Sequence, residues 1–228
     1  MSQTATLLLR LEGPMQSWGY RSRFKNRDTG TEPTKSGVIG LLCCALGRDR
    51  SESIADLAAL KMHVRVDLAG RLMTDFHTAG GGVFRGSDEY FAPTSSGSKG
   101  KNPIILEKQY LADASFVVAL EGDSKLINDL AEAVQDPYWP LNLGRKSCPP
   151  TLPVYVGVSL EPAVQALPQV PLSNPRTEAN PRLRYVWESS VPDDHTESRN
   201  DVPVSWENRL DRQYAARFVK SELGEPQA

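Results

Sequence analysis

The sequence predicts an α+β protein with a βαββαβ order of elements and one long insertion. Short apolar runs with strand-like spacing, two stretches with helical spacing, and a Gly- and Ser-rich interruption support this prediction. The chain has 228 residues, of which 39% are hydrophobic and 24% are charged. These proportions are ordinary for a globular protein, and the length allows one large domain with or without a small extension.

The first quarter of the chain predicts a strand and then a helix. Thr4–Leu11 is a short apolar run followed by a Gly-Pro break, which is typical of a buried strand. Thr34 is a suitable N-cap for a helix whose apolar residues recur at helical spacing, and Gly47 is a suitable stop. Ser53 begins a pattern like a capping box, which predicts a second helix.

Two strands and the insertion come next. Met62–Leu68 alternates apolar with polar residues, which predicts a strand with one polar face. Leu72–His77 predicts a further strand. Thr78–Pro103 is rich in glycine and serine, and insertions of this length in compact domains are usually functional or disordered.

The pattern closes with two more strand-like runs, Ile104–Ala112 and Ser115–Glu121, a helix and a last strand. Ser124 is a suitable cap for the helix, which should end at Pro137. Val154–Leu160 has the composition of a strand.

This order fits a ferredoxin-like domain over residues 1–160, with an extended hairpin projecting from it. Residues 161–228 are Pro-rich at first and then mix strand and helix signals. We expect them to form a small C-terminal appendage that packs on the main domain.

Charge and cysteine content narrow the class of protein. The net charge is −2 and the pI is near 6.0, so any nucleic-acid contact must come from local clusters of cations. The three cysteines form no CxxC pair, which favours reduced thiols over a zinc site or a disulfide framework. There is no signal-peptide pattern and no apolar run of about 20 residues. We expect a cytoplasmic protein without a metal, another cofactor or a membrane partner.

The clearest cation pattern is Arg21, Arg23, Lys25 and Arg27, which alternate with other residues around Phe24. In an extended segment alternate residues share a side, so four cations would line one edge beside an aromatic ring. That arrangement suits a phosphate backbone with a base stacked nearby. A solvated loop explains the same pattern equally well.

Two further cation pairs are weaker signals. Lys35 and Ser36 open the first long helix, where free N–H groups favour a phosphate, although the spacing is not that of a P-loop. Arg145 and Lys146 follow the aromatic pair Tyr138-Trp139, whose rings could stack on a base. The alternative places Trp139 in the core and the cations in solvent.

Signals for an enzyme are poor. His77, with Tyr90 or Tyr110 and with Lys108, could in principle supply the acid, base and charge stabilisation of metal-independent RNA cleavage. A single histidine at a strand end is more often structural. Hydrolase, zinc-protease and dinucleotide-binding motifs are absent.

Five short blocks together resemble the CasD family, the subunit of type I-E Cascade that binds the 5′ handle of CRISPR RNA. They occur in family order and cover roughly residues 5 to 160. The blocks are LLLRLEGPMQSWG (Leu7–Gly19), PTKSGVIGLL (Pro33–Leu42), DFHT (Asp75–Thr78), YLADASF (Tyr110–Phe116) and LGRKSCP (Leu143–Pro149).

The resemblance implies an RRM-related ferredoxin-like domain with a β-hairpin thumb at about 78–110. It implies a non-catalytic subunit that binds the handle, caps the foot of the complex, and contacts the Cascade backbone and large subunits. The subunit would act on target DNA through the assembled complex, which serves in antiviral defence. The RNA-binding candidates are Arg21, Arg23, Lys25, Arg27, Lys35, Ser36, His77, Lys108, Arg145 and Lys146.

Two other functions stay open at this stage. The first is a metal-independent endoribonuclease that processes the CRISPR RNA precursor, as the homologous subunit does in the related type I-C branch. The second is a purely structural protein–protein adaptor, which the net charge of −2 favours.

Overall fold

The computed structural model describes residues 3–19, 26–80, 82–84, 88–90, 92–93, 97, 99–100, 103–173, 182–207 and 212–226. The helices are α1 (Lys35–Leu46), α2 (Ala55–Ala58), α3 (Ser124–Gln135) and α4 (Ala163–Gln169). The strands are β1 (Thr4–Gln16), β2 (Asn26–Arg27), β3 (Lys61–Leu68), β4 (Arg71–Ala79), β5 (Gly82–Phe84), β6 (Asp88–Tyr90), β7 (Ala92–Pro93), β8 (Lys99–Gly100), β9 (Ile104–Asp123), β10 (Tyr155–Ser159), β11 (Leu183–Ser189), β12 (Glu197–Ser205) and β13 (Gln213–Gly224). No helix in this part of the chain is long and apolar enough to cross a membrane.

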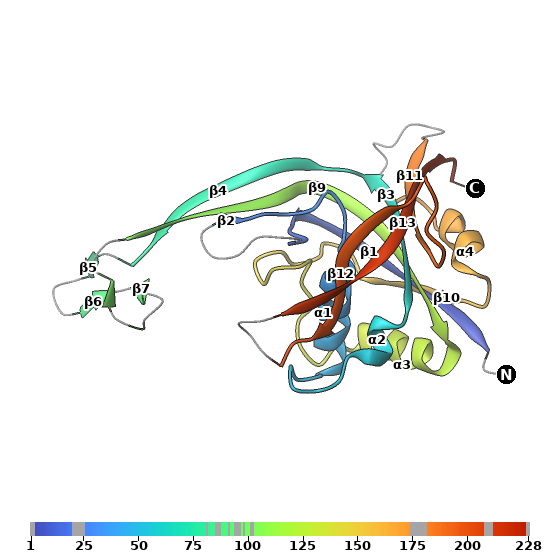
Figure 1. Cartoon of the computed structure of the whole chain (residues 1–228), viewed down its shortest axis with the longest axis horizontal. Coiled ribbons are helices and arrows are strands. Elements are labelled where there is room, and N and C mark those ends of the chain that lie inside the picture. The colour runs from blue at the N-terminus through green and yellow to red at the C-terminus, as the bar shows by residue number, and fades with distance from the viewer. Residues whose placement is uncertain are drawn as a thin grey trace.

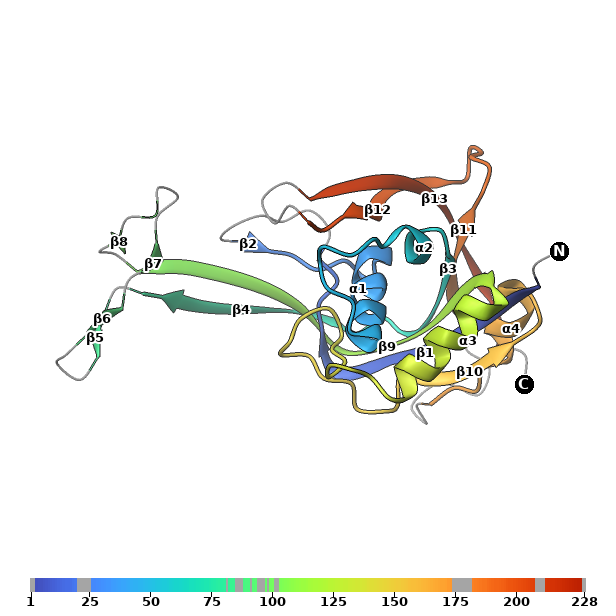
Figure 2. The same cartoon turned by 90° about the horizontal axis from the view of Figure 1, so that it is seen from below.

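One large sheet organises the molecule, as expected for an α+β protein. Its strands run in the order β10-β1-β9-β3-β11-β13-β12, with antiparallel neighbours, and β2 and β4 also pair with β9. The sheet curves, so that α1 lies between the β1–β9 part and the β12–β13 part (Figure 2). The short strands β5 to β8 form two small ribbons of their own.

Both faces of the central strands are buried, which explains why Leu7–Leu9 in the run at the start of the chain is apolar without alternation. In β1, Leu7 and Leu9 belong to the core that also holds α1 and α3, whereas Leu8 belongs to a second core beneath α4. Alternate residues of a strand point to opposite faces, so a strand covered on both sides needs no polar alternation.

Most of the expected elements are present, and their ends follow local chemistry. The Thr34 hydroxyl accepts a hydrogen bond from the Gly37 N–H, and Gly47 ends α1 in the left-handed conformation, as predicted. The predicted cap of α3 is wrong by one residue, because Asp123, not Ser124, accepts hydrogen bonds from the first turn. The second helix, α2, has only four residues.

The polar face of β3 is buried rather than exposed. The Arg65 side chain is fully buried and donates to the Asp67 carboxylate at 2.7 and 3.0 Å. It also donates to the carbonyl oxygens of Leu167 and Val170, at the end of α4, at 2.8 and 2.7 Å. Alternation therefore predicted the strand correctly. The polar face of β3, through Arg65, forms hydrogen bonds with the end of α4.

The two strand-like runs after the insertion are one strand, β9, of 20 residues. With β4 it forms a hairpin arm, paired from Arg71 with Ala112 to Ala79 with Ile104, that projects from the body (Figure 1). The arm begins at Arg71, earlier than the predicted insertion. Gly70 and Asp113, both with positive φ, lie where the arm leaves the body.

The C-terminal segment continues the main sheet. β11 pairs with β3, from Arg184 with Val66 to Val186 with Val64, and β13 and β12 follow outward. Strands from residues 161–228, which we expected to form an appendage, thus join the main sheet, and the division at residue 160 stays a prediction. Glu32, just before α1, forms ion pairs with both Arg184 and Arg199 of this extension.

Candidate nucleic-acid interface

Three strands pair around Asp75 and Lys108 of the hairpin arm and bring predicted site residues together. We call this place the base of the arm. β2 runs parallel to β9 with Arg27 opposite Lys108, and β4 runs antiparallel on the other side with Asp75 opposite Lys108. Direct neighbours in a sheet point to the same face. Arg27, which is exposed, and Lys108, which is half-buried, therefore lie side by side on one surface.

Arg145 joins this surface from the loop after α3. Its guanidinium donates to the Gln109 carbonyl at 3.1 Å and to the carbonyls of Arg27 and Asp28 at 3.0 and 3.2 Å. It also lies over the Tyr110 ring, 4.7 Å from the ring centroid, in cation–π geometry. Carbonyl oxygens carry no net charge, so Arg145 fixes β2 against β9 and still adds a positive charge to the surface.

The loop reaches this position because Gly144 permits a close approach. Its φ is +87°, and a Cβ atom there would lie 1.8 Å from the Ser17 carbonyl oxygen. The Ser17 N–H donates to the Leu143 carbonyl at 3.1 Å, and the Ser17 hydroxyl donates to the Gln109 carbonyl at 3.1 Å. The LGRKSCP block thus packs against the MQSWG block, and Lys146 is left exposed at the loop's surface.

The segment with Arg21, Arg23 and Lys25 lies outside the described residues, but both of its ends are fixed. The Trp18 N–H donates to the Thr29 hydroxyl at 2.9 Å. The Gly30 N–H in turn donates to the Trp18 carbonyl at 2.7 Å. Trp18 itself is fully buried. The described residues on either side of the segment, Trp18 and Gly30, are thus joined to each other directly.

Lys35 does not reach the surface, which corrects its assignment as an RNA contact. Its side chain is 3% exposed, and Nζ lies 3.0 Å from a Glu188 carboxylate oxygen. Burial lowers the pKa of Lys35, and attraction from Glu188 opposes that change. The charge is already compensated inside the protein.

The start of α1 is likewise occupied. The Lys35 N–H donates to the Asp201 carboxylate at 2.8 Å, and the Gly37 N–H donates to the Thr34 hydroxyl. A carboxylate of the chain itself thus takes the place in which a phosphate was predicted. Ser36 is half-buried, and its hydroxyl lies 3.5 Å from the Thr34 hydroxyl.

His77 lies on the arm, on the same face as Asp75 and Lys108. Its Nδ1 is 3.2 Å from the Asp75 carboxylate, and its side chain is 32% exposed. Its partner across the ladder is Leu106, four residues before Tyr110. At about 3.3 Å per residue, His77 and Tyr110 stand roughly 13 Å apart.

A family model described as CRISPR-associated protein (Cas_Cas5) matches residues 6–220, most of the chain. The chain belongs to the Cas5 family. It is similar to the CRISPR system Cascade subunit CasD of Escherichia coli (strain K12), with 37% identity over 165 residues, which are 66% of this chain and 70% of the relative. The resemblance that the five blocks predicted is thereby confirmed.

Two solved structures extend the likeness to nearly the whole Cas5 chain. A chain of a CRISPR RNA-guided surveillance complex is 33% identical with a TM-score of 0.77, covering 96% of this chain and 90% of that one. A structure described as a crystal structure of Cas protein is 36% identical with a TM-score of 0.72, covering 97% and 95%. The C-terminal extension of the sheet therefore belongs to the shared fold.

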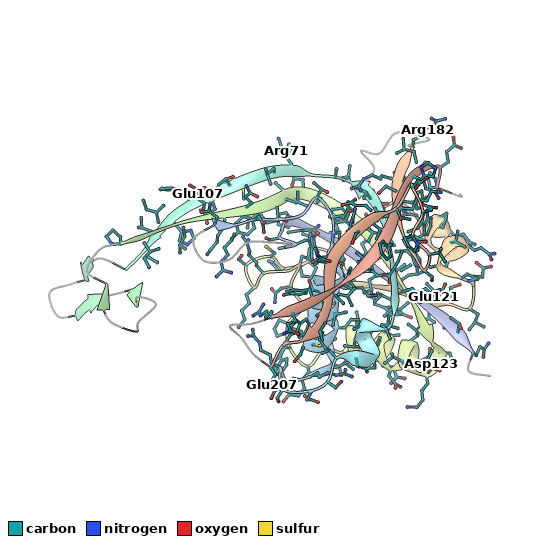
Figure 3. The ribbon with its side chains drawn as sticks, in the orientation of Figure 1. Arg71, Glu107, Glu121, Asp123, Arg182 and Glu207 are labelled. Atoms are coloured by element: carbon teal, nitrogen blue, oxygen red, sulfur yellow. The ribbon has the colours of Figure 1, made fainter. Side chains whose placement is uncertain are left out.

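The two faces of the arm in this Cas5 chain differ in chemistry. The face opposite Lys108 exposes three large apolar side chains: Leu72 by 62%, Phe76 by 61% and Ile105 by 50%. Arg71 and Glu107 mark the course of the arm away from the body (Figure 3). A two-stranded ribbon with an exposed apolar face is marginally stable by itself, so this face is suited to being covered by a partner.

Sequence reasoning missed the residues that determine which predicted cations reach the surface. Asp201 and Glu188 hold Lys35, and no local pattern connects them with the start of α1. The anchoring role of Arg145 had one local signal, the preceding Gly144, whose positive φ allows the loop to close on Ser17. Among the described residues no group of His, Cys, Asp and Glu side chains could hold a metal ion.

Proposed function

We propose that this Cas5 chain is a non-catalytic subunit of a type I-E CRISPR surveillance complex and binds the 5′ handle of CRISPR RNA at the base of its hairpin arm. The names of its relatives, a Cascade subunit and a CRISPR RNA-guided surveillance complex, support the assignment. The observation that carries it is the surface on which Arg27, Lys108 and Arg145 converge.

Single-stranded RNA needs phosphate contacts and a few contacts to splayed bases. Arg27, Lys108 and Lys146 supply cations, and Arg145 adds charge while it holds the strands in place. Arg21, Arg23 and Lys25, which precede Arg27 in the sequence and lie outside the described residues, would add further cations, and His77 would contact a base. A net charge of −2 is compatible with this role because the contacts are local. Base pairing with the guide RNA, and not this chain, then recognises the sequence of the target DNA.

We infer a ferredoxin-like, RRM-related domain within the larger sheet. The order β10-β1-β9-β3 with antiparallel neighbours, and the helices that follow β1 and β9, support it.

The β4–β9 arm is then the thumb. Its exposed apolar face, with Leu72, Phe76 and Ile105, suits the Cascade backbone subunit. The large subunit is a further expected partner. Such a protein acts in the cytoplasm.

The geometry favours binding over cleavage. Tyr110 is buried beneath Arg145, and its separation of roughly 13 Å from His77 is too large for one proton-transfer site. The Nδ1 atom of His77 faces Asp75 instead. Lys108 is adjacent to Arg27, so its charge serves a phosphate contact.

Purified protein mixed with repeat RNA tests the proposal. We expect binding that weakens as salt is raised, without cleavage. Reversing the charges of Arg21, Arg23 and Lys25 should abolish binding, whereas a purely structural adaptor would assemble normally with that variant. Specific cutting at the base of the handle that a His77→Ala variant loses would establish the endoribonuclease instead.

A further inference from the structure

Two neighbouring aromatic side chains stand out on the surface just after α3. Tyr138 is 71% exposed and Trp139 is 42% exposed. Their rings meet edge to face, with centroids 4.9 Å apart and an interplanar angle of 88°. Trp139 was one of the residues whose burial in the core was an open alternative, and its exposure removes that alternative.

The backbone of this pair has a structural role that does not involve the rings. The Tyr138 N–H donates to the Ala45 carbonyl at 2.9 Å, and the Trp139 N–H donates to the Cys44 carbonyl at 3.1 Å. These bonds satisfy carbonyl groups at the C-terminal end of α1. Gly47, at φ +69°, leaves room for the first ring, since a Cβ there would lie 2.7 Å from Tyr138 Cγ. The backbone of the pair is therefore held in place, while much of the Tyr138 side chain and part of the Trp139 side chain stay exposed.

Two exposed cations lie close enough to Cys44, at the end of α1, to act on its charge. Lys146 and Arg50 are both exposed, and both act on Cys44, the residue that binds the Trp139 N–H. Burial raises the pKa of the Cys44 thiol, and attraction from these two cations opposes the rise. Lys146 directly follows Arg145, so the aromatic pair and the base of the arm are joined through one short loop.

We propose that Tyr138 and Trp139 form a stacking platform for unpaired bases of the same RNA strand, next to the nucleotides held at the base of the arm. Lys146 and Arg50 would then face the phosphates that link the stacked bases. Aromatic rings beside cations are the recurring means of holding single-stranded RNA. The inference rests on the proposed function, because it extends that binding surface.

RNA fits this platform better than a protein partner does. A standard protein interface covers about 800 Å² on each side, with an apolar centre. Within the described residues, the stretches that contain the end of α1 and the pair itself, 40–60 and 124–151, expose no other large hydrophobic side chain, and the next along the chain is Leu152, 37% exposed. Two isolated rings with cations beside them suit stacked bases, whereas the aliphatic surface lies on the hairpin arm.

The test compares a Tyr138→Ser, Trp139→Ser double variant with the unaltered full chain. We expect its affinity for repeat RNA to fall roughly fivefold or more, because stacking contributes about 1–3 kcal/mol per base. The melting temperature and the salt slope should change little, since the backbone caps and the cations remain. A single Trp139→Phe variant, which keeps two aromatic rings, should have most of the affinity of the unaltered chain. Tyr214→Ser, at another exposed aromatic residue, serves as the matched control.

The outcomes separate this inference from the proposed function. If an Arg27→Ala, Lys108→Ala variant weakens RNA binding but the aromatic variant does not, the platform is overturned and the function stands. If the aromatic variant binds RNA normally but fails to assemble with partner subunits, the pair is a protein contact. If the unaltered chain does not bind repeat RNA at all, both are overturned.

Discussion

The start of α1 and the base of the hairpin arm look alike in sequence and differ completely in structure. Lys35 and Arg27 are both cations near turn signals, yet Lys35 is 3% exposed and paired with Glu188, whereas Arg27 is exposed. The anion at the helix start is Asp201, 166 residues further along the chain. Whether a cation is available to RNA is thus decided by distant residues that fold back onto it.

The buried region is an ion network that joins α1 to the C-terminal strands. Arg217 donates to both carboxylate oxygens of Asp201, at 2.7 and 3.0 Å, and to Glu188 at 3.2 Å. Glu188 also accepts from Lys35. The two acids and two bases compensate one another, so removing one of them leaves an unpaired buried charge.

The largest expected effect is on stability. Asp201→Ala leaves Arg217 without its bidentate partner and should lower the free energy of unfolding by about 3–5 kcal/mol, which is roughly 10 °C in melting temperature. Asp129→Ala is the control, because Asp129 forms an exposed pair with Lys125 and should cost less than about 0.5 kcal/mol. Equal melting temperatures for the two variants would show that the network contributes nothing.

A second effect concerns pH in the same buried region. Burial lowers the pKa of His63 from 6.5 to about 4, and its Nδ1 accepts a hydrogen bond from the Glu188 N–H at 3.1 Å. Between these values the unfolded chain binds a proton that the folded chain does not, so stability falls as the pH is lowered from 6.5 to 4. The loss should total about 3 kcal/mol and then level off.

Urea unfolding at several pH values measures this loss. A His63→Gln variant should lack that part of the pH dependence, whatever its stability at neutral pH. The same slope in the variant and the unaltered protein would assign the effect to another group.

A third prediction separates the two regions by RNA binding. Arg27→Ala should reduce the slope of log affinity against log salt by about 0.7, the share of one phosphate contact on a single strand. Lys35→Met should leave the slope unchanged, because that charge is already paired inside the protein. Titrations at several salt concentrations, with folding verified by circular dichroism, provide the measurement. A reduced slope for Lys35→Met would return this residue to the interface.

The smallest effect is expected at Ser36, whose hydroxyl makes a long, 3.5 Å contact with the Thr34 hydroxyl. Ser36→Ala should change the free energy of unfolding by less than about 0.5 kcal/mol and leave the RNA affinity unchanged. A tenfold loss of affinity would show that the helix start binds RNA after all.

Local features of the fold could be predicted from the sequence, and long-range ones could not. The Thr34 cap, the Gly47 stop and the β3 strand depend on neighbouring residues, so they were correctly predicted. The cap of α3 was displaced by one residue because Asp123 and Ser124 are both suitable N-caps. The burial of β3's polar face depends on Leu167 and Val170, about a hundred residues away, which no periodicity reveals.

The same distinction holds for the candidate site. Alternating charge identified Arg27, the cation pair that follows two aromatic residues identified Arg145, and Lys108 joined the candidates with the family resemblance. The meeting of the three residues depends on parallel pairing of β2 with β9 and on the loop that Gly144 closes. Sequence patterns thus identified candidate cations, and tertiary contacts determine which of them share a surface.

Photocrosslinking of the full chain to CRISPR RNA, followed by peptide mapping, tests the central claim most directly. We predict crosslinks in residues 26–27, 108–110 and 142–147 at the base of the hairpin arm, and none at residues 35–36. Crosslinks concentrated at the start of α1, with none at the base of the arm, would contradict the account.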